Sequence, residues 1–430
     1  MLQNKSKRLL KDSCLGTQMP YNYTPDTKVP LPEGYTPFYI NYIGRHCGRY
    51  LSNKEEAEWI CTILGCAYEH KGLTIRGLEL LSKIINILEL SEKRANYLNP
   101  VGEKSLEGIA LRMCLNYPSV FGKMITATST KEFRTQKSRD LFLKELSHHV
   151  DVTKVQLHTN GTVDPILRFF DWNQQYLRWK EQGEWKSILS EFETRSKVTD
   201  RILERIFHSE FFRYQCLNAE EKQRFISELF QIYTNQVDTS GVISLGYYFT
   251  TQDKFYFWEN TNLKQFLLMG PGLSQMRMEG KIAFPLLMDF LDTVEEAIKT
   301  RKKSLDLIFA HAETMLPFLT LLQIPELSEQ VDRPYQVAIA WKNYQMMPMA
   351  ANLQWIFYEK REEANQDILV QCKLNEEAIQ LPIKTDCYPY YRWNEVCAFY
   401  KNVLKELNLP SGKKMADLVR DYQWEECKKL

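Results

Sequence analysis

The chain has 430 residues, of which 44% are hydrophobic and 13% aromatic, so it can bury one large core or two smaller cores joined by an insertion. Its 55 Lys and Arg residues nearly balance 54 Asp and Glu residues, which excludes a global field that would favour nucleic acid, a membrane surface or a polyanion. Any anionic ligand must therefore be held by local basic clusters. No stretch approaches transmembrane length, and the composition is typical of a soluble globular enzyme.

Ten cysteines are too few for a disulfide scaffold in a chain of this length, and none forms the CxxC pairs of a zinc site. A pair such as Cys387 and Cys427 could nevertheless form a disulfide in an oxidising compartment. The first residues lack the apolar stretch of a signal peptide. We therefore expect a cytoplasmic protein if Met1 is native, and an exported or lumenal protein if a leader was removed.

Five prolines between residues 15 and 37 predict an extended, irregular N-terminal arm over residues 1–34. An aromatic and β-branched run over 38–43 predicts a strand that ends at Gly44 and leads directly into Arg45 and His46. Apolar residues at helical spacing predict two helices over 54–90 and a third over 100–115. A second strand is predicted over 123–127, followed by a helix from about 130 to 146.

Between residues 150 and 290 strand signals become scarce, and helices are predicted over 164–179, 191–206 and 219–234. We expect a helical insertion over 151–289 that could form the lid or wall of a pocket. Strand character returns at 305–310, which ends at His311, and at 355–358 and 368–374, which should form an antiparallel pair. The alternation predicts an α/β sandwich with a largely parallel sheet, built from residues 35–150 and 290–430.

Arg45 and Arg49 flank His46 directly after the first predicted strand. The planar guanidinium group matches phosphate oxygens, and a neutral imidazole between two such groups could attack phosphorus to form a phosphohistidine. In isolation the same string of residues would more simply be a basic surface turn.

Two further features favour a catalytic site. Arg134 and Ser138 lie four residues apart at the start of a predicted helix, so they share one face near the end of the preceding strand. His311 and Glu313 follow a buried strand, at the carboxyl end where open α/β sheets hold ligands. Three strand ends would thus bring three arginines, two histidines and one carboxylate to a single crevice.

On the basis of these residues, the sequence resembles the histidine acid phosphatases over most of its length. Within that family it resembles the multiple inositol polyphosphate phosphatases. The family's RHGxR motif matches Arg45, His46 and Arg49, and its second-helix arginine matches Arg134. Its HAE motif matches residues 311–313, and HAE in place of HD indicates the inositol polyphosphate branch. Further local matches are residues 99–103, 164–171 and 349–354.

Two positions in and after this motif depart from the family pattern. Cys47 stands where the motif has glycine, and Leu51 stands where it has a later proline, so the loop has less backbone freedom. Cys47 is not expected to act as a cysteine-phosphatase nucleophile, because the following residues are too few to form the required loop of backbone donors.

The resemblance implies a phosphoglycerate-mutase-like α/β sandwich and hydrolysis of phosphate monoesters through a phosphohistidine on His46. Glu313 would protonate the leaving alkoxide and then activate water. No cofactor and no metal are implied. The phosphate would be bound by Arg45, Arg49, Arg134 and His311. The implied substrates are inositol hexakisphosphate and lower inositol phosphates, and the basic residues available for their other phosphates are Lys54, Lys71, Arg76, Lys131, Arg168 and Lys180.

Two alternatives remain open at this point. The same chemistry would serve another small phosphate ester, such as bisphosphoglycerate or a sugar phosphate. Alternatively, Cys47 has disabled the loop and the protein is a non-catalytic, phosphate-binding relative. In each case we expect a small anionic ligand and neither nucleic acid nor a membrane as partner, and the sequence leaves the oligomeric state open.

Overall fold

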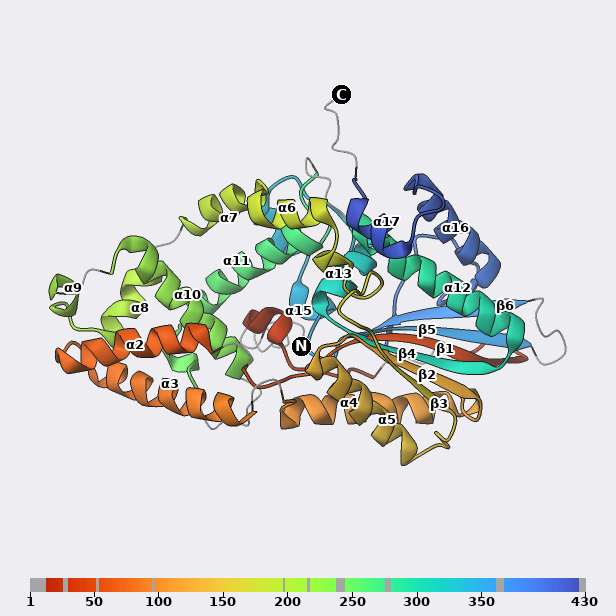
Figure 1. Ribbon diagram of the computed structural model, residues 1–430, viewed down its shortest axis with the longest axis horizontal. Coiled ribbons are helices and arrows are strands. Elements are labelled where there is room, and N and C mark those ends of the chain that lie inside the picture. The colour runs from red at the N-terminus through yellow and green to blue at the C-terminus, as the bar shows by residue number, and fades with distance from the viewer. Residues whose placement is uncertain are drawn as a thin grey trace, which may run out of the picture.

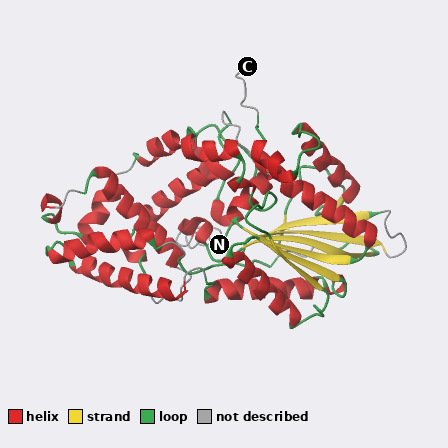
Figure 2. Cartoon of the chain, in the orientation of Figure 1, coloured by secondary structure: helices red, strands yellow, loops and turns green. Residues whose placement is uncertain are grey.

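The computed structural model describes residues 13–25, 30–51, 54–94, 97–195, 198–214, 217–236, 244–274, 280–360 and 367–424. A twisted sheet with helices on both faces forms one end of the elongated molecule, and a group of helices forms the other (Figures 1 and 2). The strands of the described residues are β1 (Tyr35–Arg45), β2 (Met124–Ser129), β3 (Val155–Thr159), β4 (Lys303–Ala310), β5 (Asn352–Lys360), β6 (Ile368–Leu374), β7 (Glu377–Ala378) and β8 (Tyr390–Arg392).

The strand order is β3-β2-β4-β1-β5-β6-β7, with β8 also paired to β6. β3, β2, β4 and β1 run parallel, and β5 pairs antiparallel with both β1 and β6. Strands β1 and β4 are almost fully buried because helices cover both faces, which explains their nearly continuous apolar sequences. The predicted α/β sheet and the predicted antiparallel pair are confirmed.

Helices from distant parts of the chain cover the two faces of the sheet (Figure 1). On one face, Phe142 packs against Tyr42 and Phe309, with ring centroids 5.2 and 5.6 Å apart. On the other face, the rings of Phe290 and Trp355 lie 4.9 Å apart. The first face is covered by α4 (Pro100–Asn116) and α5 (Phe133–Ser147), and the second by α12 (Phe284–Thr300), α13 (Ala312–Leu321), α16 (Trp393–Glu406) and α17 (Met415–Asp421).

A second hydrophobic core joins the helices at the far end of the molecule. Ile60, Ile84, Ile202 and Phe225 are each fully buried in it. The helices that contribute to it are α2 (Glu55–Glu69), α3 (Ile75–Arg94), α8 (Val198–Ile206), α9 (Phe211–Tyr214), α10 (Ala219–Gln236) and α11 (Thr251–Met269). The buried side chains of α6 (Gln174–Gln182) and α7 (Trp185–Glu193) belong instead to the core that includes the sheet. Shorter elements elsewhere are α14 (Val337–Ala340), α15 (Asn343–Met346) and the 3₁₀ turns η1 (Ser13–Gln18), η2 (Pro118–Val120), η3 (Phe169–Asp171), η4 (Gly246–Tyr248), η5 (Gly280–Ala283) and η6 (Pro334–Gln336).

The structure corrects several predicted boundaries. β3 lies inside the predicted insertion 151–289 but belongs to the sheet, and its mostly exposed sequence VQLHT explains why it was not recognised. α12 begins at residue 284, before the predicted return to the sheet at 290. α2 and α3, assigned to the catalytic part, share the core of α8 and α10 because their apolar stripes face those helices.

Three local predictions also fail. Residues 13–18 of the arm, which was predicted to be irregular, form a 3₁₀ turn in which Cys14, Leu15 and Thr17 are buried. The predicted helix over 164–179 begins only at residue 174, because the Asp164 side chain accepts a hydrogen bond from the Leu167 backbone and fixes a turn there. The predicted helix over 191–206 is divided between α7 and α8.

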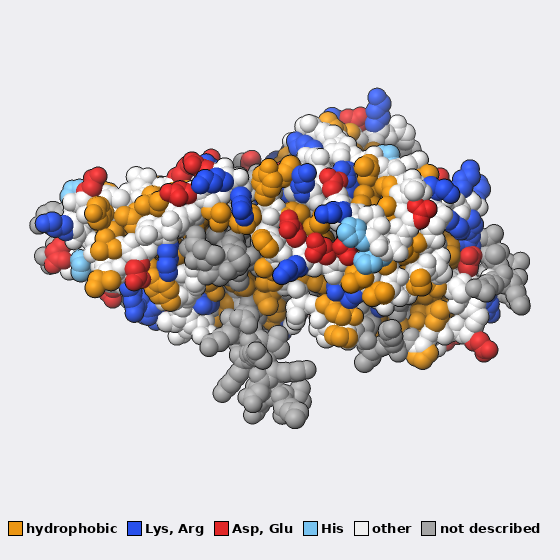
Figure 3. Space-filling model, turned by 90° about the horizontal axis from the view of Figure 1, so that it is seen from below, with side chains coloured by type: hydrophobic (Ala, Val, Ile, Leu, Met, Phe, Trp, Pro, Cys, Tyr) orange, Lys and Arg blue, Asp and Glu red, His pale blue; other side chains and the backbone are white. Residues whose placement is uncertain are grey.

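Charged side chains of both signs are interspersed over the face seen in Figure 3, in line with the balanced composition. Within the described residues, no helix is both long and apolar enough to cross a membrane. Because positive and negative charges nearly balance over the whole chain, an anion must be attracted by a local cluster of basic side chains.

Close contact between α3 and α8 depends on Gly77, where a Cβ atom would lie 2.2 Å from the carbonyl oxygen of Ile206. We expect Gly77→Ala to lower the free energy of unfolding by about 1–3 kcal/mol, because the two helices must separate. Gly65→Ala in α2 is the matched control, since its Cβ would meet nothing within 4 Å. The control should be neutral or stabilising by up to about 1 kcal/mol. Urea unfolding that gives both variants the same stability would contradict this account.

Candidate active site

The carboxyl ends of three adjacent parallel strands bring the predicted site residues together. Arg45 is the last residue of β1, and the His46 backbone N–H donates to the carbonyl of Ala310 at the end of β4, at 3.0 Å. Thr130 follows β2, and its N–H donates to the carbonyl of Phe309 at 3.3 Å. These bonds hold the residues that follow β1, β2 and β4 at one edge of the sheet.

The His46 imidazole is held in one orientation. Its Nδ1 lies 3.0 Å from the carbonyl oxygen of Cys47, which can only accept a hydrogen bond. Nδ1 therefore carries the proton in the neutral ring, and the Nε2 lone pair is left for attack on an electrophile. Burial lowers the pKa of His46 well below its ordinary value, and the charges of Arg45, Arg134 and neighbouring groups lower it further.

His311 lies beside it, with the two ring centroids 5.7 Å apart. Its Nε2 lies 2.9 Å from the hydroxyl oxygen of Thr130, and its Nδ1 lies 3.4 Å from Nη2 of Arg134. These two contacts are satisfied when Nδ1 accepts from the guanidinium and Nε2 donates to the hydroxyl, but Nη1 of Arg168, which can only donate, also lies 3.4 Å from Nε2. Burial and the charges of Arg134 and Arg168 lower the pKa of His311, so this ring is also neutral.

The arginines form a concentrated positive site. Burial lowers the pKa of Arg49 to about 10, and the positive charges of Arg134 and Arg45 act in the same direction. Burial likewise lowers the pKa of Arg134. Each of these groups remains protonated at neutral pH, and their mutual repulsion would be relieved by a bound anion. A phosphate dianion matches this cluster in charge, and guanidinium groups are well suited to bind phosphate oxygens.

Glu313 lies in the first turn of α13 and is exposed, unlike the two histidines. Its negative charge raises the pKa of both Arg49 and Arg134, so it lies within electrostatic reach of the cluster. It is therefore close to the arginines and open to solvent. The structure thus brings all six predicted site residues to one edge of the sheet.

The loop after His46 is braced by the helices beneath it. The Cys47 backbone N–H donates to the Ser138 hydroxyl at 3.3 Å. Gly102, near the start of α4, approaches so closely that a Cβ there would lie 2.4 Å from the carbonyl oxygen of Gly48. The Cys47 thiol is fully buried in the core under α4, 3.9 Å from the Ser138 hydroxyl, so the residue that replaces the motif glycine is accommodated by packing.

Arg168 and Glu132 were absent from the predicted site. Nη1 of Arg168 lies 3.4 Å from His311 Nε2 and 3.0 Å from a carboxylate oxygen of Glu132, and Asp171 pairs with the same guanidinium at 2.6 Å. Glu132 also lies 3.6 Å from Arg134. Arg168 appeared among the available basic residues and within the local family match 164–171, but it was given no place in the site, and Glu132 and Thr130 were given no role.

The other basic candidates have different surroundings. Lys54 pairs with Glu92 at 3.5 Å. Lys71 and Arg76 lie at the connection between α2 and α3, at the end of the molecule away from the sheet (Figure 1). Lys131 directly follows Thr130, and exposed Lys180 belongs to α6. Of the suggested disulfide pair, Cys427 lies outside the described residues.

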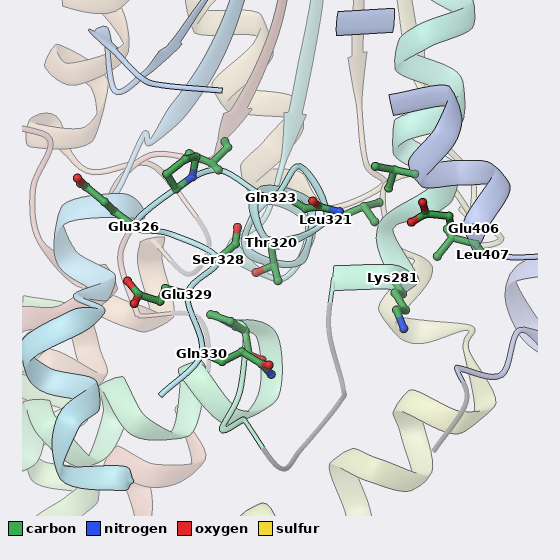
Figure 4. Close-up of a pocket in the computed structure, with 14 residues that line it drawn as sticks. Lys281, Thr320, Leu321, Gln323, Glu326, Ser328, Glu329, Gln330, Glu406 and Leu407 are labelled. Atoms are coloured by element: carbon green, nitrogen blue, oxygen red, sulfur yellow. The ribbon is translucent and has the colours of Figure 1, made fainter. Parts of the chain in front are cut away.

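A separate cavity of about 740 Å³ lies at the other end of α13 (Figure 4). None of the six site residues lines it. Its charged lining consists of Lys281 with Glu326, Glu329 and Glu406. Three carboxylates against one ammonium group would repel a phosphate ester, so this cavity does not compete as the anion site.

The neutral state of His46 can be tested directly. Since its pKa is lowered, the ring should remain neutral at about pH 5.5, where an unperturbed histidine is mostly protonated. Imidazole NMR signals assigned by comparison with His46→Ala should show no titration down to that pH. In denaturant the same ring should titrate with its ordinary pKa. A native His46 signal that titrates near 6.5 would contradict the burial of an unprotonated ring among the arginines.

Comparison with known proteins gives an independent result. A family model described as histidine phosphatase superfamily (branch 2) matches residues 98–375, which include Arg134, His311 and Glu313. No curated protein sequence matches the chain significantly.

Solved structures share the fold at low sequence identity. The multiple inositol polyphosphate phosphatase of Bifidobacterium longum, in complex with inositol hexasulfate, superposes with a TM-score of 0.79 at 19% identity, over 89% of this chain and 96% of that one. The phytase of D. castellii gives a TM-score of 0.67 at 13% identity, over 95% of this chain and 87% of that one. Since the family model covers more than half of the sequence, the chain belongs to branch 2 of the histidine phosphatase superfamily and is a phosphatase.

Proposed function

We propose that the protein hydrolyses inositol polyphosphates, including inositol hexakisphosphate, through a phosphohistidine on His46. The observation that carries the proposal is the orientation of His46. Its Nδ1–H is directed to the Cys47 carbonyl, and its ring is surrounded by the charges of Arg45, Arg49 and Arg134. An unprotonated Nε2 among guanidinium groups suits attack on a phosphate ester.

In the first step, Nε2 of His46 attacks phosphorus in line with the ester oxygen. The N–P bond forms as the P–O bond breaks, and the arginines and His311 stabilise the charge on the equatorial oxygens. Glu313 donates its proton to the leaving alkoxide, which departs as an alcohol. In the second step, Glu313 accepts a proton from water, and the resulting hydroxide displaces His46 to release inorganic phosphate.

Two observations support inositol phosphates as the substrate class. The superposed protein from Bifidobacterium longum is a multiple inositol polyphosphate phosphatase bound to inositol hexasulfate, and the second superposed protein is a phytase. In this chain, Arg168 adds a guanidinium group 3.4 Å from His311, and Lys131 directly follows Thr130 in the sequence. Extra cations around one phosphate position suit a substrate that carries several phosphates.

His46→Ala should abolish release of phosphate from inositol hexakisphosphate while the fold persists, because a covalent route has no substitute nucleophile. Rapid quenching of the wild type with ³²P-labelled substrate should recover acid-labile, alkali-stable phosphate on the protein. His46→Ala should carry none, and its circular dichroism should match that of the wild type. Recovery of the same label on His46→Ala would exclude His46 as the nucleophile.

Glu313→Gln should depress phosphorylation by inositol phosphates far more than phosphorylation by p-nitrophenyl phosphate. An inositol alkoxide leaves poorly without a proton, whereas nitrophenolate leaves well. The phosphorylation step must be followed by its burst, because dephosphorylation also requires Glu313. Bursts reduced equally with both substrates would mean that Glu313 only positions the substrate.

A further inference from the structure

The N-terminal turn η1 lies between the sheet and the helical end of the molecule, close to α11 and α15 (Figure 1). Cys14, Leu15 and Thr17 are all at least 93% buried there. A segment whose sequence predicts an irregular arm is therefore enclosed by the rest of the chain.

This turn contacts the phosphate site through Arg45. Nη1 of Arg45 donates to the backbone carbonyl of Thr17 and, at 2.9 Å, to the carbonyl of Met347. Because a guanidinium group is planar, two fixed acceptors on one nitrogen restrict the orientation of the whole group. The side chain is only 5% exposed, so water does not readily replace these acceptors.

One hydrogen-bond network fixes both carbonyls. The Thr17 hydroxyl accepts from Gln265 of α11 at 3.3 Å, and Gln265 in turn accepts from the Asn343 side chain at 2.7 Å. The carbonyl of Asn343 accepts from the Met347 backbone N–H at 2.8 Å. Asn343 also accepts from the Trp258 indole of α11 at 3.0 Å. The orientation of Arg45 is thereby tied to α11.

The path of the turn depends on Gly16. Its φ of 57° and ψ of −136° are rarely adopted by residues with a side chain. A Cβ there would also lie 3.3 Å from Nδ2 of Asn343. A larger residue at this position would shift the neighbouring Thr17 peptide, whose carbonyl contacts Arg45.

We infer that η1 is a positioning element of the phosphatase site, in which the Thr17 carbonyl orients the Arg45 guanidinium group for phosphate binding. This inference rests on the proposed role of Arg45 in phosphate binding. It assigns to Gly16 and Thr17 an effect on turnover although neither needs to touch the substrate.

The test compares Gly16→Ala with Gly34→Ala. Both glycines have positive φ values, but a Cβ at Gly34 would meet nothing within 4 Å, so it controls for backbone strain alone. We expect Gly16→Ala to lower kcat for phosphate-ester hydrolysis about 10-fold, since a small misplacement of a positioning group is costly. Gly34→Ala should stay within about twofold of the wild type.

A double-mutant cycle then separates action through Arg45 from a general structural effect. In an Arg45→Ala background, Gly16→Ala should cause almost no further loss. A full additional 10-fold loss in that background, or wild-type activity of Gly16→Ala alone, would overturn the inference. If Gly16→Ala fails to fold by circular dichroism, Thr17→Val replaces it in the cycle, because it removes only the acceptor for Gln265.

Binding of inorganic phosphate, measured by calorimetry on the same proteins, makes the test independent of turnover. If the wild type binds phosphate but hydrolyses no ester, the proposed function fails. In that case the inference still predicts that Gly16→Ala weakens phosphate binding when Arg45 is present. It also predicts no further weakening when Gly16→Ala is added to Arg45→Ala. Unchanged phosphate binding by Gly16→Ala would overturn it in that case.

Discussion

Repulsion among buried guanidinium groups is the constraint on which this site depends. Arg45, Arg49 and Arg134 all lower the pKa of His46, and Arg168 joins them in lowering that of His311. Positive charges gathered away from water are held only if the surrounding structure fixes them and supplies partial compensation. Backbone carbonyls, carboxylates and the neutral imidazoles provide this compensation while leaving the cluster net positive. A phosphate would complete it, so the site is electrostatically prepared for an anionic ligand.

The carboxylates are placed where they moderate the cluster without filling it. Glu132 lies between Arg134 and Arg168, and Asp171 holds the outer side of Arg168. Glu313 stands apart from these pairs and is exposed at the start of α13. The acidic groups therefore have separate tasks: two restrain arginines, and the third remains available for proton transfer under the proposed mechanism.

The sequence was sufficient to predict that the side chains at or directly after the ends of the strands gather at one edge of the sheet. Arg45, His46, His311 and Glu313 stand out because apolar runs end beside them, and parallel strands must then bring their carboxyl ends together. Arg168 could not be found in this way. It reaches His311 because residues 164–171 cross the start of α13, where the Thr314 hydroxyl donates to the Leu167 carbonyl at 2.7 Å. This contact depends on tertiary packing, and no periodic pattern or spacing of residues in the local sequence indicates it. The same applies to η1, whose polar, proline-rich surroundings gave no indication of burial.

The parallel pairing of β1 with β4 joins Arg45 to Ala310, across more than half of the chain, and Arg45 also binds the carbonyl of Ala351 through its backbone. Contacts of such long sequence separation form slowly, because loop closure is unfavourable until the intervening chain has organised. A nascent or partly unfolded chain thus lacks the anion site, since no local segment contains enough of it. Phosphate binding is in effect a property of the completed fold, and a phosphate-rich solution should favour the native state over partly folded ones by mass action.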